Sequence, residues 1–200
     1  MRLKKRRVFL ERPSTRRERD YLDAAHRSCA LHRGFVITAA NPSEYRDYLR
    51  RTRRDSQEAF FVVAAESHEL AGVVNINDIV REQEQSGRLG YYAFVPHAGA
   101  GLMREGLLHV IRLAFLELGL HRLEANIQPA NHRSIALVAG LGFQREGAAR
   151  GYLKIGGRWR DHERWSLLCA DWRAKPSLRS TAACVTERQR GGVDGFAEHE

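Results

Sequence analysis

One stretch of the chain, from Gly90 to Leu118, constrains the fold most, because it combines a short strand, a glycine-spaced loop and a long helix. Tyr91 to Val95 is rich in residues that favour strands, and Pro96 cannot continue a ladder of hydrogen bonds, so we expect the strand to end there. After the loop, apolar residues recur at steps of three, four and seven until Gly119, which predicts an amphipathic helix. The apolar stripe consists of Leu102, Met103, Leu107, Val110, Ile111, Ala114 and Leu118.

The loop before this helix is suited to bind an anion. The first turn of a helix presents free N–H groups and the positive end of the helix dipole, and Gly99 and Gly101 let the backbone approach a ligand with no Cβ in the way. A dinucleotide fingerprint would need a third glycine where the chain has Arg104, and the Gly-Lys-Ser/Thr of a Walker loop is absent. Arg104 favours a bound anion, because the dipole opposes a cation in the first turn. His97 either contacts that anion or is solvated, and a loop without a ligand is the alternative.

The predicted strand at Leu123 to Gln128 has one apolar and one polar face. Its residues alternate, so Leu123, Ala125 and Ile127 face one way, while the polar residues between them face the other. A polar face on an otherwise buried strand suggests a cleft. The polar residues are Arg122, Glu124, Asn126 and Gln128.

These segments resemble the GNAT N-acetyltransferases. In that family the pyrophosphate of acyl-coenzyme A lies in a loop often written Gln/Arg-x-x-Gly-x-Gly/Ala. The window from Ala98 to Met103 matches its central glycine and departs at its first and last positions. Leu120 to Phe143 resembles the family's strand, its Asn-x-x-Ser and a helix ending in Leu-Gly-Phe. Gly142 to Trp172 is similar to the RimJ/RimL-type branch (ribosomal-protein-alanine N-acetyltransferases), whose early Pro-Trp is absent around Gly34 to Pro42.

The resemblance covers residues 8–172 and implies an acetyl-coenzyme A (acetyl-CoA) site. Backbone groups of Phe94 and Val95 would hold pantetheine and polarise the thioester carbonyl. Asn131 would contact the pantetheine arm, and Ser134 would lie near the sulfur, where its hydroxyl hydrates or protonates the thiolate. Glu124 would take the proton of the amine through a water. The residues expected around the pyrophosphate are His97, Gly99, Ala100, Gly101, Leu102, Met103 and Arg104.

Simpler roles for the same residues remain open. Asn131 begins a predicted helix, where asparagine is a favoured cap, and Ser134 follows one turn later. Glu124 is either a base or a structural carboxylate paired with His121, Arg122 or Arg133. Many GNAT enzymes have a tyrosine further along this helix as the acid, and residues 135–139 contain none, which shifts that role to Ser134 or water.

We expect an α/β fold of the GNAT type, with a largely antiparallel central sheet of about seven strands and four helices around it. The order of predicted elements is mixed and contains several hairpins, which argues against regular βαβ winding. Residues 1–172 should form this single domain. Residues 173–200 are rich in Ser, Thr, Arg and Gly, with little apolar periodicity, and are expected to form a disordered tail.

Composition limits the class of protein and its partners. The net charge of +9 is concentrated near the start, in a basic segment from Arg2 to Arg19 that is either a solvated face, a field that attracts coenzyme, or a contact for RNA or the ribosome. No apolar run reaches the ~18 residues of a membrane span, so we expect a cytoplasmic protein with no membrane partner. Cys29, Cys169 and Cys184 are far apart and odd in number, which predicts reduced thiols and no zinc site.

The sequence therefore predicts an acetyl-CoA-dependent N-acetyltransferase without a metal, acting on the N-terminal α-amine of a protein or peptide by direct transfer in a ternary complex. An α-amine has a pKa near 8, against about 10.4 for lysine, so far more of it is neutral at pH 7. Two alternatives remain: an N-acetyltransferase of a small amine, such as an amino-acid analogue or antibiotic, or a non-catalytic acyl-CoA sensor or ribosome-binding factor.

Overall fold

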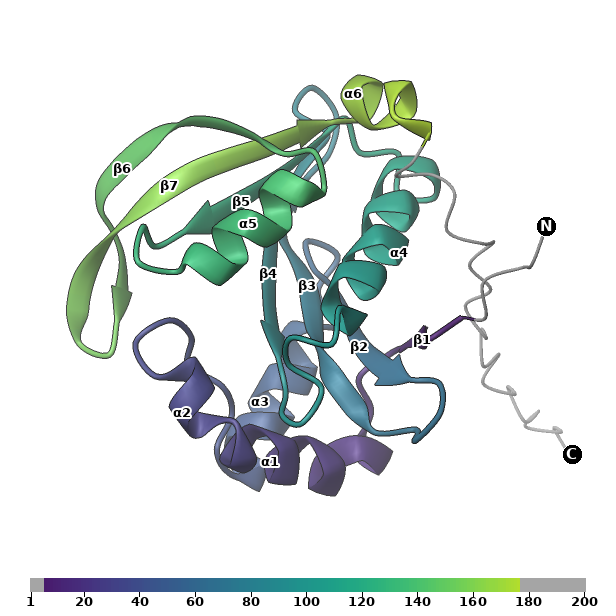
Figure 1. The fold of residues 1–200 in the computed structure, drawn as a ribbon, viewed down its shortest axis with the longest axis vertical. Helices are drawn as coiled ribbons and strands as arrows, with labels where there is room; N and C mark the ends of the chain where they lie inside the picture. Colours follow the sequence, from purple (N-terminus) through teal and green to yellow (C-terminus); the bar gives the residue numbers. More distant parts are fainter. Residues whose placement is uncertain (1–5, 177–200) are drawn as a thin grey trace, which may run out of the picture.

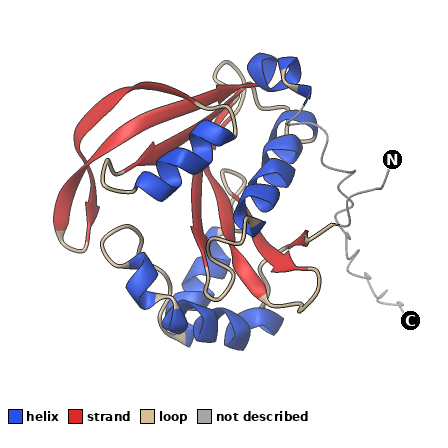
Figure 2. Cartoon of the chain, in the orientation of Figure 1, coloured by secondary structure: helices blue, strands red, loops and turns tan. Residues whose placement is uncertain are grey.

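The computed structural model describes residues 6–176, which form a seven-stranded sheet with helices on both faces (Figures 1 and 2). The strand order is β1-β2-β3-β4-β5-β7-β6. The strands are β1 (Val8–Glu11), β2 (Glu58–Ala64), β3 (Leu70–Val80), β4 (Ser86–Ala93), β5 (Arg122–Ile127), β6 (Gln144–Ile155) and β7 (Arg158–Leu168). The helices are the 3-10 helix η1 (Thr15–Arg17) and the α-helices α1 (Glu18–Arg27), α2 (Cys29–His32), α3 (Pro42–Arg51), α4 (Leu102–Leu116), α5 (His132–Gly140) and α6 (Cys169–Ala174).

Neighbouring strands of the sheet are antiparallel except β4 and β5, which run parallel. The connection between these two strands contains α4, as a parallel crossover requires. The β4–β5 ladder ends at the pair Leu89 and Ala125, although β4 stays paired with β3 as far as Ala93. The two strands therefore separate beyond Leu89, and Figure 1 shows β4 and β5 diverging.

Two apolar cores lie on opposite faces of the sheet because successive residues of a strand point to opposite sides. Phe60 and Val62 of β2 belong to the core beneath α4, α5 and α6. Phe61 and Val63 belong to the core beneath α1 and α3. Gly106 lets α4 lie close to the sheet, since a Cβ there would approach the Val62 side chain to 2.5 Å.

The predicted fold class is confirmed, and the differences are local. The helical segment from Thr15 to His32 is divided into η1, α1 and α2, with a break at Ser28, whose hydroxyl donates to the Ala24 carbonyl at 2.7 Å. These pieces and α6 bring the α-helices among residues 6–176 to six rather than four. Because α6 continues to Ala174, ordered structure passes the expected domain boundary at residue 172; the rest of the predicted tail, residues 177–200, lies outside the described residues.

Candidate active site

The opening between β4 and β5 is bordered by the loop that precedes α4. Gly99 and Gly101 have φ angles of 86° and 80°, a left-handed conformation that favours glycine, and Gly101 is the N-cap of α4. Among residues 6–176, no acceptor is recorded for the amides of Gly101, Leu102, Met103 and Arg104. The loop therefore directs free N–H groups outward at the positive end of a 15-residue helix.

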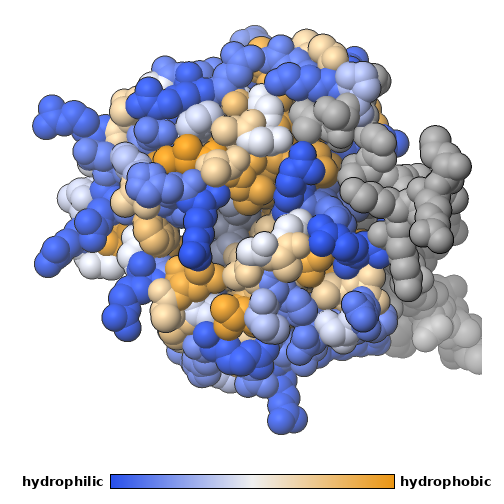
Figure 3. Space-filling view, in the orientation of Figure 1, coloured by the Kyte–Doolittle hydropathy of each residue, from blue (hydrophilic) through white to orange (hydrophobic). Residues whose placement is uncertain are grey.

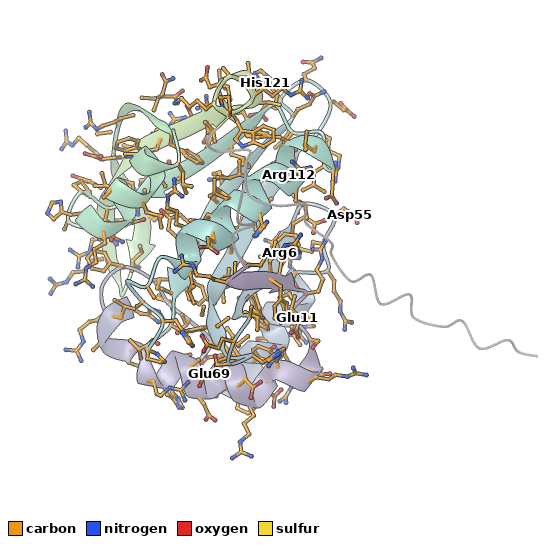
Figure 4. The ribbon with its side chains drawn as sticks, turned by 45° about the vertical axis from the view of Figure 1, so that its right-hand side comes forward. Arg6, Glu11, Asp55, Glu69, Arg112 and His121 are labelled. Atoms are coloured by element: carbon orange, nitrogen blue, oxygen red, sulfur yellow. The ribbon has the colours of Figure 1, made fainter. Side chains whose placement is uncertain are left out.

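Arg7 joins the chain before β1 to this loop, a contact that sequence reasoning missed. Its guanidinium donates to the Ala100 carbonyl at 3.0 Å and to Glu105 Oε1 at 2.6 Å. Glu105 lies in the first turn of α4, where its charge suits the dipole but would repel a bound phosphate. Arg7 compensates that charge. Figure 4 shows the neighbouring Arg6 beside α4.

The two side chains predicted to contact an anion at this loop, those of Arg104 and His97, differ in their surroundings. Arg104 is exposed in the first turn of α4 and has no carboxylate partner in the described part of the chain. His97 is half-buried, and its Nε2 lies 3.0 Å from Glu69 Oε2 in the turn between β2 and β3, so its predicted contact with an anion stays a prediction. The side chains of Leu102 and Met103 lie in the core, so only their backbone amides face the loop.

The end of β4 is held from both sides. The Phe94 amide donates to the Ala71 carbonyl at 2.8 Å, and the Val95 amide donates to Ser28 Oγ at 3.0 Å. The structure thus gives both amides protein acceptors, and their predicted role toward a thioester carbonyl stays a prediction. His32 of α2 is hydrogen-bonded through Nε2 to the Ala93 carbonyl at 2.8 Å, and burial lowers its pKa.

Asn131 and Ser134 meet β4 at the start of α5. Asn131 Oδ1 accepts from the Ser134 amide at 3.2 Å, so the capping role is observed. Ser134 Oγ lies 2.5 Å from the hydroxyl of Tyr91 on β4, and burial raises the pKa of Tyr91 to about 12. Sequence reasoning missed this partner because it searched for a tyrosine on α5 itself.

Glu124 lies on the polar face of β5, as predicted, and is ion-paired. The Arg122 Nε donates to Glu124 Oε1 at 2.9 Å, and Arg164 of β7 lies 3.8 Å from the same oxygen. The other end of Arg122 binds Glu146 of β6, whose pKa falls to about 2, first because of Arg122 and then because of the Ser166 hydroxyl. Glu124 thus makes the ion pairs expected of a structural carboxylate, and its role as a base remains a prediction.

A polar cluster continues across the strands on the same face of the sheet. Arg88 of β4 donates to the Tyr152 hydroxyl of β6 at 2.9 Å and pairs with Asp78 at 2.8 Å. Asn126 of β5 also donates to Tyr152, at 3.2 Å, and its Oδ1 is buried with no partner in the described region. In the core beneath α1 and α3, none of the described residues comes from β5, β6 or β7. Helices α1 and α3 therefore do not cover the half of the sheet that these three strands form. Apolar residues gather in the middle of the view between the β6–β7 hairpin and α1–α2 (Figure 3).

Three further observations concern metal, thiols and membranes. Within residues 6–176, no three His, Cys, Asp or Glu residues are grouped to hold a metal ion. Cys29 and Cys169 are free thiols, and Cys184 lies outside the described part of the chain. No helix in residues 6–176 has the length and apolar character needed to span a membrane.

Together, the diverging parallel pair and the free amides at the N-terminus of α4 define an α/β domain that presents a helix N-terminus beside an opening in its sheet. A family model described as "Acetyltransferase (GNAT) domain" matches residues 7–144. The chain belongs to this acetyltransferase family.

Curated relatives and solved structures agree with the family. The chain is 36% identical over 125 residues to a Bacillus subtilis protein named "Probable N-acetyltransferase YjcK", covering 62% of this chain and 69% of the relative. It is 42% identical over 104 residues to the [ribosomal protein uS5]-alanine N-acetyltransferase of Escherichia coli, covering 52% of this chain and about half, 54%, of that protein.

Two solved structures are similar over most of the chain. The ribosomal-protein-S5-alanine acetyltransferase of Vibrio fischeri has a TM-score of 0.75 and 25% identity, over 85% of this chain and 97% of that one. The spermidine N-acetyltransferase of Vibrio cholerae, in complex with CoA and spermine, has a TM-score of 0.71 over 84% and 98% of the two chains. At 18% identity, the second likeness concerns the fold alone.

Proposed function

We propose that the chain is an acetyl-CoA-dependent N-acetyltransferase that acts on the N-terminal α-amine of a protein or peptide. The observation that carries the proposal is the opening between β4 and β5, with free amides of α4 at one end and Ser134 beside it. A long, anionic thioester can be held at its phosphates by the helix N-terminus while its acyl group reaches the opening.

The coenzyme end would be built from backbone groups and two cations. The amides of Gly101 to Arg104 would donate to the pyrophosphate, with Gly99 and Ala100 forming the wall of the loop. Arg104 would add a positive charge, and Arg7 would neutralise Glu105 so that the carboxylate does not repel the phosphates. His97 would act indirectly, because its hydrogen bond with Glu69 anchors the residue before the loop.

The reacting end would use Asn131, Ser134 and Glu124. Asn131 caps α5 and so fixes the position of Ser134, whose hydroxyl would stabilise the leaving thiolate. Glu124 would accept the proton of the amine through a water. Because an α-amine has a pKa near 8, a weak base suffices, which is compatible with a carboxylate that Arg122 already holds.

Direct attack fits the site better than a covalent acyl-enzyme. Neither Cys29 nor Cys169 lies on β4, β5 or the loop before α4, and Ser134 has a hydroxyl partner rather than a base. The amine would attack the thioester carbon, the C–S bond would break, and the amine proton would leave through Glu124 and water. Sulfur would take a proton from solvent.

The acceptor is proposed from the relatives and from charge. Both ribosomal-protein alanine acetyltransferases named above act, by their names, on an alanine of a ribosomal protein, and the present acceptor would be an amine of a similar protein. A polyamine acceptor is the rival, because a spermidine enzyme shares the fold. The net charge of +9 opposes a polycation.

The test measures release of free thiol from acetyl-CoA with four additions: a panel of peptides with free N-termini, the same peptides with blocked N-termini, spermidine, and buffer alone. We expect turnover with the free peptides only. Turnover with spermidine would replace the proposed acceptor by a polyamine. Coenzyme binding without turnover on any amine would favour the non-catalytic sensor.

A further inference from the structure

Tyr91 and Ser134 form the one described hydrogen bond between the side chains of β4 and α5. Tyr91 lies two residues beyond Leu89, where the β4–β5 ladder stops, and its ring packs against the core beneath α4 and α5. Its hydroxyl is 2.5 Å from Ser134 Oγ, while the Ser134 carbonyl is at 3.4 Å. This hydrogen bond joins β4 to α5 beside the opening in which the proposed function places the thioester.

We propose that Tyr91 is a positioning residue, which donates its hydroxyl hydrogen to Ser134 Oγ and thereby leaves the Ser134 hydrogen free to point at the coenzyme sulfur. The inference rests on the proposed function and deepens it. A serine hydroxyl has one hydrogen and two lone pairs, so it can donate in only one direction. If Tyr91 fills one lone pair, the donor of Ser134 is available to the thiolate.

Tyr91 can donate to Ser134 Oγ at 2.5 Å or to the Ser134 carbonyl at 3.4 Å, and the shorter contact fits donation to Oγ. Asn131 Oδ1 accepts from the Ser134 amide and not from its hydroxyl, so no other recorded side chain among residues 6–176 competes for the serine hydrogen. Burial raises the pKa of Tyr91 to about 12, so the phenol keeps its hydrogen throughout the neutral range. Tyr91 is then a constant donor.

The chemical step balances without a proton transfer from either hydroxyl. The C–N bond forms as the C–S bond breaks, and the electron pair of the C–S bond stays on sulfur. The amine loses one proton to water through the base, and the thiolate gains one from solvent. Ser134 contributes a hydrogen bond to the developing negative charge, which is the kind of contact that stabilises a transition state.

The experiment compares Tyr91→Phe, Ser134→Ala and the double variant, with Tyr45→Phe as the matched control. Tyr45 is a fully buried tyrosine of α3 that donates to the Ser14 carbonyl at 2.8 Å on the other side of the sheet. Both substitutions of tyrosine keep the ring and remove the hydrogen bonds of one hydroxyl group. We expect kcat to fall about tenfold in Tyr91→Phe and in Ser134→Ala, because one hydrogen bond of this kind is lost, with KM for acetyl-CoA unchanged.

The double variant distinguishes positioning from a structural effect. If Tyr91 acts through Ser134, the double variant has the kcat of Ser134→Ala and no further loss. The deficit of Tyr91→Phe should also be the same across the neutral pH range, and Tyr45→Phe should lower the melting temperature without lowering kcat. Ser134→Thr, which keeps a hydroxyl, should restore sensitivity to Tyr91→Phe.

Two results would overturn the inference while leaving the proposed function intact: a normal kcat in Tyr91→Phe, or multiplied losses in the double variant. A raised KM for acetyl-CoA with unchanged kcat would assign Tyr91 to coenzyme binding and would also overturn it. Absence of acetyl transfer in the unmodified protein would remove the proposed function and the inference together.

Discussion

The two ends of the β4–β5 opening are built in different ways. At the α4 end the site consists of backbone amides, set by Gly99 and Gly101 and by the start of one helix. At the β5 end it consists of side chains from several strands, joined by the Arg122 ion pairs and the Arg88–Tyr152 hydrogen bond. Backbone sites depend on local conformation, whereas side-chain sites depend on partners distant in the sequence. The α4 end should therefore lose its function when a backbone angle changes, and the β5 end should lose its function when a charged side chain is replaced.

The largest effect is expected at the α4 end. In Gly101→Val, a β-branched side chain must adopt a φ of 80°, and its Cβ would lie 3.2 Å from the Arg7 guanidinium. If the variant loses one hydrogen bond between the loop and the charged pyrophosphate, acetyl-CoA affinity should fall about 10- to 150-fold. Calorimetry measures this affinity. Gly119→Val is the matched control, because Gly119 follows the other end of α4 with a φ of 68° and open space around it. Equal affinity in the two variants would contradict the assignment of the loop.

At the β5 end, Glu124→Gln should lower turnover in a pH-dependent way. Only about a tenth of an α-amine with a pKa near 8 is neutral at pH 7, so a base can contribute about tenfold there and little above pH 8. The measurement is kcat against pH with a peptide acceptor. A loss independent of pH, together with a lower melting temperature, would show that Glu124 serves only as the partner of Arg122 and Arg164.

A smaller effect is expected from Arg7→Met. The variant leaves Glu105 unpaired beside the phosphates, and because Arg7 is half exposed, acetyl-CoA affinity should fall only about two- to fivefold. The control is Arg12→Met, since Arg12 is equally exposed and pairs with Glu58 away from the loop. Calorimetry at low and high salt should show the difference shrinking as salt rises. An identical affinity for the two variants would remove Arg7 from the site.

The smallest effect concerns acid stability at the β5 end. The pKa of Glu146 is lowered to about 2 when folded, against about 4.3 in an unfolded chain, so its stabilising contribution is present above pH 4.3 and is lost as the pH falls toward 2. Glu146→Gln should therefore flatten the decrease of the melting temperature over that range. Glu84→Gln, at an exposed position between β3 and β4, should not. If the melting temperature fell equally with pH in the two variants, the ion pair between Glu146 and Arg122 would not stabilise the fold.

The sequence predicted what depends on neighbours along the chain. The alternation of β5 is observed, with Leu123, Ala125 and Ile127 buried, and the helix after Gly101 starts where its apolar stripe begins. The mixed order of predicted elements and the hairpins, together with the resemblance to the GNAT family, predicted the fold class.

What the sequence could not show depends on contacts between distant residues. Tyr91 and Ser134 are 43 positions apart, and Arg7 and Glu105 are 98 apart. A histidine beside a glycine loop suggested a solvated group or a phosphate ligand, whereas the fold brings Glu69 to it. Only the packing of β2, β3 and α4 decides that outcome.

The measurement that tests the central claim most directly is mass spectrometry of one peptide with a free N-terminus and an internal lysine, incubated with acetyl-CoA and the protein at pH 7. The account predicts one added acetyl group, located on the N-terminal α-amine, in the unmodified protein, and a much slower reaction in Gly101→Val than in Gly119→Val. Acetylation of the lysine alone, or of neither amine, would contradict it.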